Sequence, residues 1–290
     1  MISQAPRVAV SGASGYLGSR ICETLESHGW DVIRLVRDPN PSDRRSRYFD
    51  LEKDVPHQSL ESVDLLIHGA YDLSLTRPSD IWRVNVEGTR RLLSAARGAG
   101  VRRLIVLSSM SAYEGTTQLY GRSKLEIERL ATQYGGCSIR PGLVYAKEPR
   151  GMMGALNKIA GMWVVPVPSG DPRQYPVHED DLMAVIARLS EVDALPSEPI
   201  GVAQATPVAL RDLLRVLAAR QGRPGHLVTV PWQALYWALR LAELAPLRMP
   251  FRADSLLGLV HPAPFVPSRE LLSALGISLR GFELSAADGS

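Results

Sequence analysis

The stretch Ser11-Gly12-Ala13-Ser14-Gly15-Tyr16-Leu17-Gly18 decides the fold class of this chain of 290 residues. It follows an apolar strand pattern at Arg7–Ser11 and opens a helical pattern at Tyr16–His28. Glycines in such a turn allow a tight bend and a close approach of the backbone to a pyrophosphate, and the helix N-terminus favours the anion. The stretch therefore predicts a β–α unit that holds a dinucleotide. The predicted contact residues are Gly12, Ser14, Gly15, Tyr16, Leu17 and Gly18.

Strand and helix patterns alternate along the rest of the N-terminal half, which disfavours the alternative of an ordinary glycine-rich turn. The further strand patterns are Asp31–Val36, Arg47–Leu51, Asp64–His68, Val101–Ser108 and Cys137–Arg140, and the helical patterns are Asp80–Ala99, Leu119–Tyr134 and Asp180–Ser190. Such alternation implies a parallel sheet with right-handed crossovers. We therefore predict an α/β fold, a doubly wound parallel Rossmann sheet with a small C-terminal α/β substrate lobe.

The regular alternation weakens after residue 150, where several prolines follow one another closely. We predict a dinucleotide-binding Rossmann domain over residues 1–150, to which the segment 177–190 returns. Residues 151–290 are predicted to form mainly the substrate-binding lobe. Ligands of open α/β sheets bind outside the carboxyl ends of the strands, so we expect this lobe to cap those ends.

Composition excludes several classes of protein. Hydrophobic residues make up 45% of the chain, enough for a sizeable core, and the net charge of +3 is spread along the sequence rather than bunched as in a nucleic-acid-binding surface. No uncharged apolar run reaches the roughly 20 residues that a membrane span requires. The first strand pattern begins too early for a signal peptide, and Cys22 and Cys137 are typical of buried thiols. We expect a cytoplasmic protein with a small-molecule substrate, no nucleic-acid partner, no integral membrane segment and no metal.

Tyr120 and Lys124 lie four residues apart in a helical pattern and therefore share one face of the helix. A free tyrosine titrates near ~10, and a neighbouring ammonium favours the phenolate and lowers that value. Ser109, at the end of a strand pattern, offers a hydroxyl for a substrate oxygen. An exposed Tyr and Lys on an amphipathic helix would be the simpler interpretation of this pair alone. The glycine turn and the serines, in this order, favour a site that moves a proton while a nicotinamide moves a hydride.

Arg37 follows the second strand pattern, roughly 20 residues beyond the glycine turn, where an acidic residue binds a ribose 2′-hydroxyl and an arginine suits a 2′-phosphate. Guanidinium pairs well with phosphate, which favours NADP over NAD. In the alternative interpretation, Asp38 or Asp31 binds NAD and Arg37 is merely solvated. Asp50 and Leu51, at the end of the third strand pattern, are expected to flank the adenine.

The chain resembles an extended short-chain dehydrogenase/reductase of the NAD-dependent epimerase/dehydratase type. The resemblance spans roughly residues 7–190 and rests on the glycine stretch and on a set of later motifs. These motifs are His68-Gly69-Ala70, Asn85-Val86-Glu87-Gly88-Thr89, Ser108-Ser109, Tyr120-Gly121-Arg122-Ser123-Lys124-Leu125-Glu126, Arg140-Pro141-Gly142-Leu143-Val144-Tyr145 and Val177-His178-Glu179-Asp180-Asp181-Leu182. As a set they are specific for the family and much less specific for any substrate.

This resemblance implies roles for individual residues. Tyr120 is the expected acid/base, Lys124 its partner and holder of the nicotinamide ribose, and Ser109 the hydroxyl that orients the substrate, with Ser108 and Ser111 as alternatives to Ser109. The expected lining of the cofactor cleft is Ala70, Tyr71, Ser108, Pro141, Gly142 and Val144. The family commonly pairs two subunits through its long helices, which implies a homodimer.

Three departures from the family pattern concern the substrate. Ser109 and Tyr120 are only 11 residues apart, so the longer loop of sugar-nucleotide members is absent. An expected Asn after residue 140 is also missing. Gln174 stands where the family often has an arginine, and Arg173, one position away, is expected to take its place as a substrate contact. Arg252 resembles the late arginine that grips a substrate phosphate, although a surface ion pair with Asp254 is an equal alternative.

Two reactions fit this constellation. The resemblance favours an epimerase- or dehydratase-like oxidoreductase, in which a hydride leaves a sugar or sugar-nucleotide carbon and returns in one cycle. The departures and Arg37 favour an NADPH-dependent carbonyl reductase or alcohol dehydrogenase with a non-nucleotide substrate. A non-catalytic NADP sensor is the third hypothesis, and the intact Tyr/Lys/Ser group argues against it.

The segment Trp232–Leu244 is predicted to be an unusually apolar helix, with polar residues only at Gln233, Arg240 and Glu243. A helix this apolar is buried or meets a partner. Burial under the lobe is the simplest expectation. A lid over a lipophilic substrate, a subunit contact and a membrane-surface contact are the alternatives.

Overall fold

A computed structural model describes residues 5–222, 225–244 and 251–283 of the chain. Its centre is a sheet of seven parallel strands in the order β11-β6-β5-β4-β1-β2-β3. These strands are β1 (Arg7–Ser11), β2 (Asp31–Val36), β3 (Ser46–Tyr48), β4 (Leu65–His68), β5 (Arg103–Leu107), β6 (Cys137–Pro141) and β11 (Ile200–Val202). The reversal of strand order at β1 is that of a doubly wound sheet, which confirms the predicted fold class.

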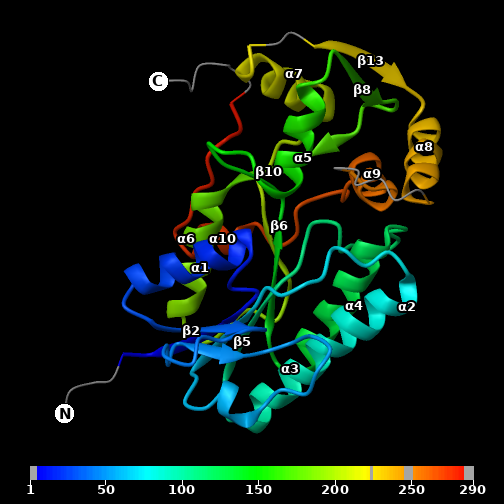
Figure 1. The fold of residues 1–290 in the computed structure, drawn as a ribbon. Coiled ribbons are helices and arrows are strands. Elements are labelled where there is room, and N and C mark those ends of the chain that lie inside the picture. Colours follow the sequence, from blue (N-terminus) through cyan, green and yellow to red (C-terminus); the bar gives the residue numbers. More distant parts are fainter. Residues whose placement is uncertain (1–4, 223–224, 245–250, 284–290) are drawn as a thin grey trace.

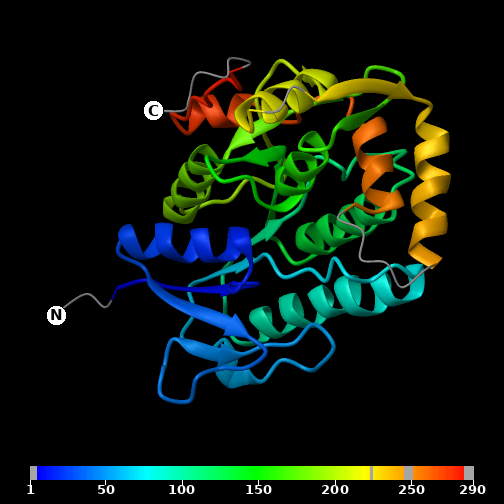
Figure 2. The ribbon, with the colours of Figure 1, turned by 45° about the horizontal axis from the view of Figure 1, so that its top comes forward.

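Helices cover both faces of this sheet, as Figures 1 and 2 show. One face carries α1 (Tyr16–Ser27), α6 (Glu179–Glu191) and α10 (Glu270–Ala274), and the other carries α3 (Glu87–Gly98) and α4 (Leu119–Gln133). Alternation along a strand explains the two cores: Val8 and Val10 point toward α1, and Ala9 points toward α3 and α4. Two short helices, η1 (His57–Ser59) and α2 (Pro78–Ile81), lie in the connections.

Three segments differ from the sequence-based expectations. The helix predicted over 80–99 contains a π-helical turn, η2 (Trp82–Val86), between α2 and α3. Strand β3 ends at Tyr48 rather than at residue 51, because Asp50 Oδ1 accepts the backbone N–H of Glu52 and turns the chain. Strand β11 extends the sheet beside β6 although only three residues carry its pattern, so the chain after residue 195 also returns to the Rossmann sheet.

A smaller lobe contains most of the chain after residue 150 and has a core of its own. It contains α5 (Gly151–Ala160), β8 (Val164–Pro168), α7 (Leu210–Arg220), β13 (His226–Val230), α8 (Trp232–Leu244) and α9 (Ala253–Val260). Two strand pairs join it to the sheet: β7 (Leu143–Tyr145) with β10 (Pro176–His178), and β9 (Arg173–Gln174) with β12 (Val208–Ala209). The lobe contacts the loops that follow β5 and β6, at the carboxyl ends of the sheet strands (Figure 1).

The apolar helix α8 is only partly covered. Leu235, Tyr236 and Leu239 pack against the core of the lobe, while the side chains of Trp237 and Leu241 are 64% and 67% exposed. The simplest expectation, complete burial, is therefore wrong for this stripe. Within the described residues, no helix combines the length and the apolar character that crossing a membrane requires.

Candidate active site

The glycine turn between β1 and α1 requires glycine for two separate reasons. Gly12 has φ = +74°, and a Cβ there would lie 2.8 Å from the backbone nitrogen of Ala70. A Cβ on Gly18 would overlap the carbonyl oxygen of Gly12, so helix and turn touch there. The backbone N–H of Gly15 donates to the Gly12 carbonyl at 2.9 Å and closes the turn. Gly15, the N-cap of α1, makes no side-chain cap, which leaves this helix terminus suited to a pyrophosphate.

A buried histidine ties the glycine turn to the next strand. Ser11 Oγ lies 2.7 Å from His68 Nδ1, and His68 Nε2 lies 2.8 Å from Thr89 Oγ1. Because Thr89 donates its hydroxyl proton to the Asn85 carbonyl, it accepts from His68, whose proton is therefore on Nε2. Burial, with a smaller effect of the Lys124 charge, lowers the pKa of His68 from 6.5 to about 3. The neutral ring is a fixed structural link that the motif His68-Gly69-Ala70 did not reveal by itself.

The first two turns of α4 bring Tyr120 and Lys124 together, as their spacing predicted. Lys124 Nζ lies 5.8 Å from the centre of the Tyr120 ring and donates to the Leu107 carbonyl at 2.7 Å. Burial raises the pKa of Tyr120 to about 12, and a hydrogen bond with Ser109 acts in the opposite direction. Burial lowers the pKa of Lys124 to about 8, against the effect of the Glu128 carboxylate. At neutral pH the group therefore joins a neutral phenol, a lysine that is mostly protonated and a serine hydroxyl.

Helix α4 is held tightly against the preceding loop. A Cβ on Gly121 would collide with the carbonyl oxygen of Ser111, so only glycine fits where the helix touches this loop. On the buried side of the helix, Glu128 accepts from Arg140 Nε at 2.8 Å and from Nη2 at 2.6 Å. Such two-point pairing fixes geometry as well as charge. The backbone of Ser111, rather than its hydroxyl, makes the contact with Gly121.

The side chain of Tyr71 packs directly against Tyr120 and Lys124. The two rings meet edge to face with centres 5.1 Å apart, and Lys124 Nζ lies 4.7 Å from the centre of the Tyr71 ring. The Tyr71 hydroxyl bonds Ser123 Oγ at 2.8 Å, and Ser123 donates to the Tyr120 carbonyl at 2.9 Å. Asn85 holds the same loop by binding both backbone polar groups of Asp72. Tyr71 is thus part of the cluster that contains Tyr120 and Lys124.

The residues predicted to line the cofactor cleft follow three neighbouring strands. Ala70 donates its backbone N–H to Ser11 Oγ after β4. The buried hydroxyl of Ser108, after β5, has no hydrogen-bond partner within the described residues. Gly142, after β6, donates its N–H to the Val202 carbonyl, and a Cβ there would collide with the Tyr175 carbonyl. The orphaned hydroxyl of Ser108 fits a polar ligand lying across these strand ends, whereas Gly142 is packed against the Tyr175 backbone.

Two other predicted cleft residues, Pro141 and Val144, flank Gly142. Pro141 is buried at the end of β6, and its carbonyl accepts from the backbone of Met110. Val144 pairs with Val177 in the short β7–β10 ladder. Both residues help to fix the strand ends where the cofactor is expected.

The arginines within and beside β2 fall into two groups, those with and those without an ion pair to a described residue. Arg34 pairs with Glu26 at 2.6 Å, and Arg45 pairs with Asp31 at 3.0 Å. Arg37 is exposed and makes no ion pair with a described residue. At the end of the third strand, Asp50 caps its own turn and the carbonyl of Leu51 accepts from Arg91 Nη2 at 2.5 Å. Arg37 is therefore available for a phosphate, while Asp50 and Leu51 hold the neighbouring backbone.

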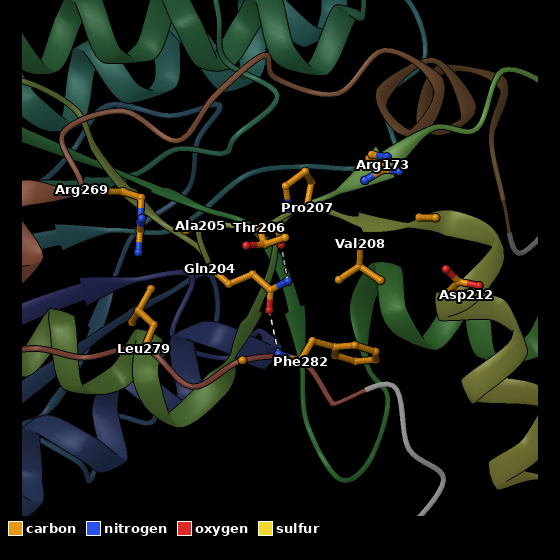
Figure 3. Close-up of a pocket in the computed structure, with 12 residues that line it drawn as sticks. Arg173, Gln204, Ala205, Thr206, Pro207, Val208, Asp212, Arg269, Leu279 and Phe282 are labelled. Carbon is orange, nitrogen blue, oxygen red and sulfur yellow. Dashed lines mark hydrogen bonds between the residues drawn. The ribbon is translucent and has the colours of Figure 1, made fainter.

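The two arginines predicted to meet substrate lie in different places. Arg173 lines an open cavity of about 550 Å³ with Thr206, Arg269 and Phe282, and neither Tyr120 nor a residue of the glycine turn lines it (Figure 3). Arg252 Nη1 donates to the Leu73 carbonyl at 2.5 Å.

The structure also uses two neighbours of these arginines in ways that the sequence did not indicate. Gln174 Nε2 donates to the Leu259 carbonyl at 2.7 Å and so fastens α9 to β9. The Asp254 carboxylate accepts the backbone N–H groups of Leu119 and Tyr120, not the guanidinium of Arg252. These contacts link residues more than 80 positions apart, so no local sequence pattern predicts them.

Two relatives share broad similarity with the chain. The ceramide reductase of Caulobacter vibrioides (strain NA1000 / CB15N) is 27% identical over 238 residues, which cover 77% of this chain and 73% of that protein. The 3-beta-hydroxysteroid dehydrogenase of Mycolicibacterium neoaurum is 26% identical over 192 residues, which cover 53% of this chain and about half, 52%, of that protein.

Solved structures confirm the fold over nearly the whole chain. MoeE5 in complex with UDP-glucuronic acid and NAD has a TM-score of 0.71 at 23% identity, covering 95% of this chain and 94% of that one. The Thermus thermophilus UDP-glucose 4-epimerase complex with NAD has a TM-score of 0.69 at 20% identity, covering 96% and 95%. A family model described as NAD dependent epimerase/dehydratase family matches residues 8–198. The Rossmann sheet, the glycine turn and this match lead to one conclusion: the chain is an enzyme of the NAD dependent epimerase/dehydratase family, whose chemistry uses a nicotinamide cofactor.

Proposed function

We propose that the protein is an NADPH-dependent reductase, or the reverse dehydrogenase, of a lipophilic carbonyl compound that carries no nucleotide. The observation that carries this proposal is the use of Gln174 and Arg252 within the protein. Gln174 binds the Leu259 carbonyl, and Arg252 binds the Leu73 carbonyl. Gln174 carries no charge that could pair with a substrate diphosphate, and Arg252 directs one N–H group to the protein backbone while its Nε has no hydrogen-bond partner among the described residues. Similarity to a ceramide reductase and to a 3-beta-hydroxysteroid dehydrogenase supports a lipophilic substrate.

Three side chains carry the proposed chemistry. The reduced nicotinamide, when bound, supplies a hydride to the carbonyl carbon. Tyr120 donates its phenolic proton to the carbonyl oxygen, so the products are an alcohol and the oxidised cofactor. Ser109, which hydrogen-bonds Tyr120, orients the same oxygen, and the Lys124 ammonium stabilises the phenolate that remains. Ser108 and Ser111 flank this position, and the unpaired hydroxyl of Ser108 is the second candidate for a substrate contact.

NADP is the proposed cofactor because Arg37, just after β2, is exposed and makes no ion pair with a described residue. The glycine turn would hold the pyrophosphate through Gly12, Gly15 and the N-terminus of α1. Ala70 and Gly142 would form the walls of the cleft, and Asp50 and Leu51 would flank the adenine. NAD is the alternative cofactor, with Asp38 at the ribose; Asp31 does not fit this role, because it lies at the amino end of β2 and pairs with Arg7 and Arg45.

A redox-neutral epimerase or dehydratase is the second candidate function. The match to the NAD dependent epimerase/dehydratase family over residues 8–198 favours it, and the same Tyr120, Lys124 and Ser109 would serve. Such an enzyme returns the hydride to its substrate and retains its cofactor through the cycle. A reductase exchanges cofactor in every turnover. The state of the purified protein therefore distinguishes the two.

The first experiment is to purify the protein without added nucleotide, denature it and identify the cofactor released. We expect little bound cofactor and reversible binding of NADPH. NADPH consumption with long-chain and steroidal ketones then tests the substrate class, with Tyr120→Phe as the matched inactive variant. Loss of one general acid is expected to lower kcat by about 10²- to 10⁴-fold while NADPH affinity is retained. One equivalent of retained NAD(H) would instead support the redox-neutral candidate, and full activity of Tyr120→Phe would support a site other than this one.

A further inference from the structure

The helix that carries Tyr120 lacks a cap from its own segment. Helix α4 begins at Leu119, and its N-cap residue Gln118 makes no side-chain bond to the helix. The first N–H groups of a helix have no partner within it, so they need an acceptor from elsewhere. Tyr120 is the second residue of α4, which makes its position depend directly on how this terminus is held.

The acceptor is the carboxylate of Asp254, from the first turn of α9 in the small lobe. Asp254 Oδ1 accepts the backbone N–H of Leu119 at 2.9 Å, and Oδ2 accepts that of Tyr120 at 3.2 Å. A negative charge at a helix N-terminus is favourable in itself, in addition to the two hydrogen bonds. The residue therefore performs for α4 the task of an N-cap, although it lies 134 positions further along the chain than Tyr120.

Further bonds make α9 and the segment before α4 into one unit. Gln118 Nε2 donates to the Asp254 carbonyl at 3.0 Å, and the Tyr113 hydroxyl donates to the His261 carbonyl at 3.0 Å. A Cβ on Gly258 would lie 2.6 Å from the Gln118 amide, so the two elements are in close contact. The small lobe therefore binds both the first residues of α4 and the loop that precedes them.

We propose that Asp254 is a positioning residue for Tyr120, through which the small lobe completes the active site. The inference rests on the proposed acid/base role of Tyr120. With Asp254 in place, the first turn of α4 is held so that the Tyr120 hydroxyl meets Ser109 and the substrate oxygen. Without it, the two N–H groups lose their acceptor and the first turn frays, which moves the phenol away from the reacting atoms.

The test compares the full-length protein with Asp254→Ala, Asp254→Asn and the control Asp212→Ala. Asp212 lies in the first turn of α7 in the same lobe and pairs with Arg215 of its own helix. Amide hydrogen exchange is measured at Leu119 and Tyr120, and kcat and NADPH affinity are measured with a ketone that the wild type reduces. Exchange needs no turnover, so it tests the cap even when the substrate is unknown.

We expect Asp254→Ala to speed exchange at Leu119 and Tyr120 while leaving the glycine turn at residues 12–18 unchanged. Its kcat should fall by about 10- to 100-fold, because small displacements of a reacting group have large effects, with NADPH affinity retained. Asp254→Asn should be intermediate, since its amide oxygen accepts one N–H while its amide nitrogen cannot accept the other. Asp212→Ala should match the wild type in both measurements.

The inference is overturned by unchanged exchange at residues 119–120 in Asp254→Ala, or by faster exchange there with kcat retained. A loss of NADPH affinity equal to the loss of kcat would also overturn it, because the effect would then be general. A wild type that reduces no ketone argues against the proposed function alone, and the exchange measurement still decides whether Asp254 holds α4.

Discussion

At the scale of single residues, burial sets the protonation of the candidate site more strongly than neighbouring charges do. Tyr120, Lys124 and His68 all favour their neutral forms relative to the free side chains, and burial is the largest cause in each case. The unperturbed pKa of a side chain follows from its residue type, which the sequence gives. How deeply that side chain is buried depends on the folded structure. Two of these shifts lead to measurable pH dependences.

The buried His68 is expected to make stability fall in acid. Its pKa is about 3 in the folded protein and 6.5 in the unfolded chain, so the unfolded state takes up the proton first. The stability linked to this residue is complete above pH 6.5 and is lost as the pH falls toward 3, with a slope of up to about 1.4 kcal/mol per pH unit. Urea unfolding between pH 7 and pH 5 measures this slope. It should be smaller in His68→Gln and unchanged in His226→Gln, whose ring is exposed.

Lys124 is expected to produce a limb in the pH profile of the reaction. Its pKa is about 8 in the folded protein, so its ammonium is lost as the pH rises through that value. If the ammonium stabilises the Tyr120 phenolate, kcat/KM for carbonyl reduction falls above pH 8, since this ratio reports the free enzyme. Rates measured from pH 6 to pH 10 test this. Lys124→Met should be slow at every pH and should lack the limb, and a limb that persists in this variant would assign it to another group.

At the scale of elements, helix α4 positions the candidate catalytic side chains, and the end of strand β2 is expected to determine which cofactor binds. Helix α4 places Tyr120, Lys124 and Glu128 on one face at intervals of four residues, which the sequence pattern predicted for the first two. The predicted strand and helix positions were confirmed for most of the sheet because hydrophobic periodicity is a local property. Strand β11 was missed because three residues are too short for a pattern, and its place depends on pairing with β6.

The end of β2 is expected to select the cofactor. Arg37 is exposed there without an ion pair to a described residue, whereas Arg34 is engaged with Glu26. Hydrogen bonds to charged groups contribute about 1.5–3 kcal/mol, so Arg37→Ala should weaken NADPH binding by roughly 10- to 100-fold and leave NADH binding nearly unchanged. Titration calorimetry with both nucleotides measures this. Arg34→Ala is the control and should alter neither affinity by a comparable factor, and equal losses for both nucleotides would remove Arg37 from the phosphate site.

At the scale of the whole molecule, two lobes share one site. The Rossmann sheet supplies the glycine turn and α4, and the small lobe supplies α9, which binds the start of α4. The exposed Trp237 and Leu241 of α8 lie on the same lobe, and their stripe was expected to be buried. The family analogy for assembly concerns a different surface, namely the long helices α3 and α4.

We expect a homodimer formed through α3 and α4, with a mass twice the 31.7 kDa of one chain. Arg129, exposed on α4 between two acidic partners, is suited to a test by charge reversal. Arg129→Glu should shift the light-scattering mass toward that of one chain, because three like charges then lie together. Leu241→Ser, on α8, is the matched control and should leave the mass unchanged. A dimer broken by the α8 variant alone would move the interface to the small lobe.

The sequence by itself determined the sheet, the glycine turn and the pairing of Tyr120 with Lys124, because strand period, helix period and glycine spacing act between near neighbours. Only the tertiary structure decided which side chains remain free for a substrate. Arg173 and Gln174 are adjacent in the chain, yet one lines an outer cavity and the other fastens α9. Asp254 reaches the start of α4 across 134 positions, a contact made by the docking of two lobes and by no local pattern. Which partner each polar side chain binds depends on long-range packing. For this reason the sequence predicted which residue types form the candidate site but not which hydrogen bonds hold them in place.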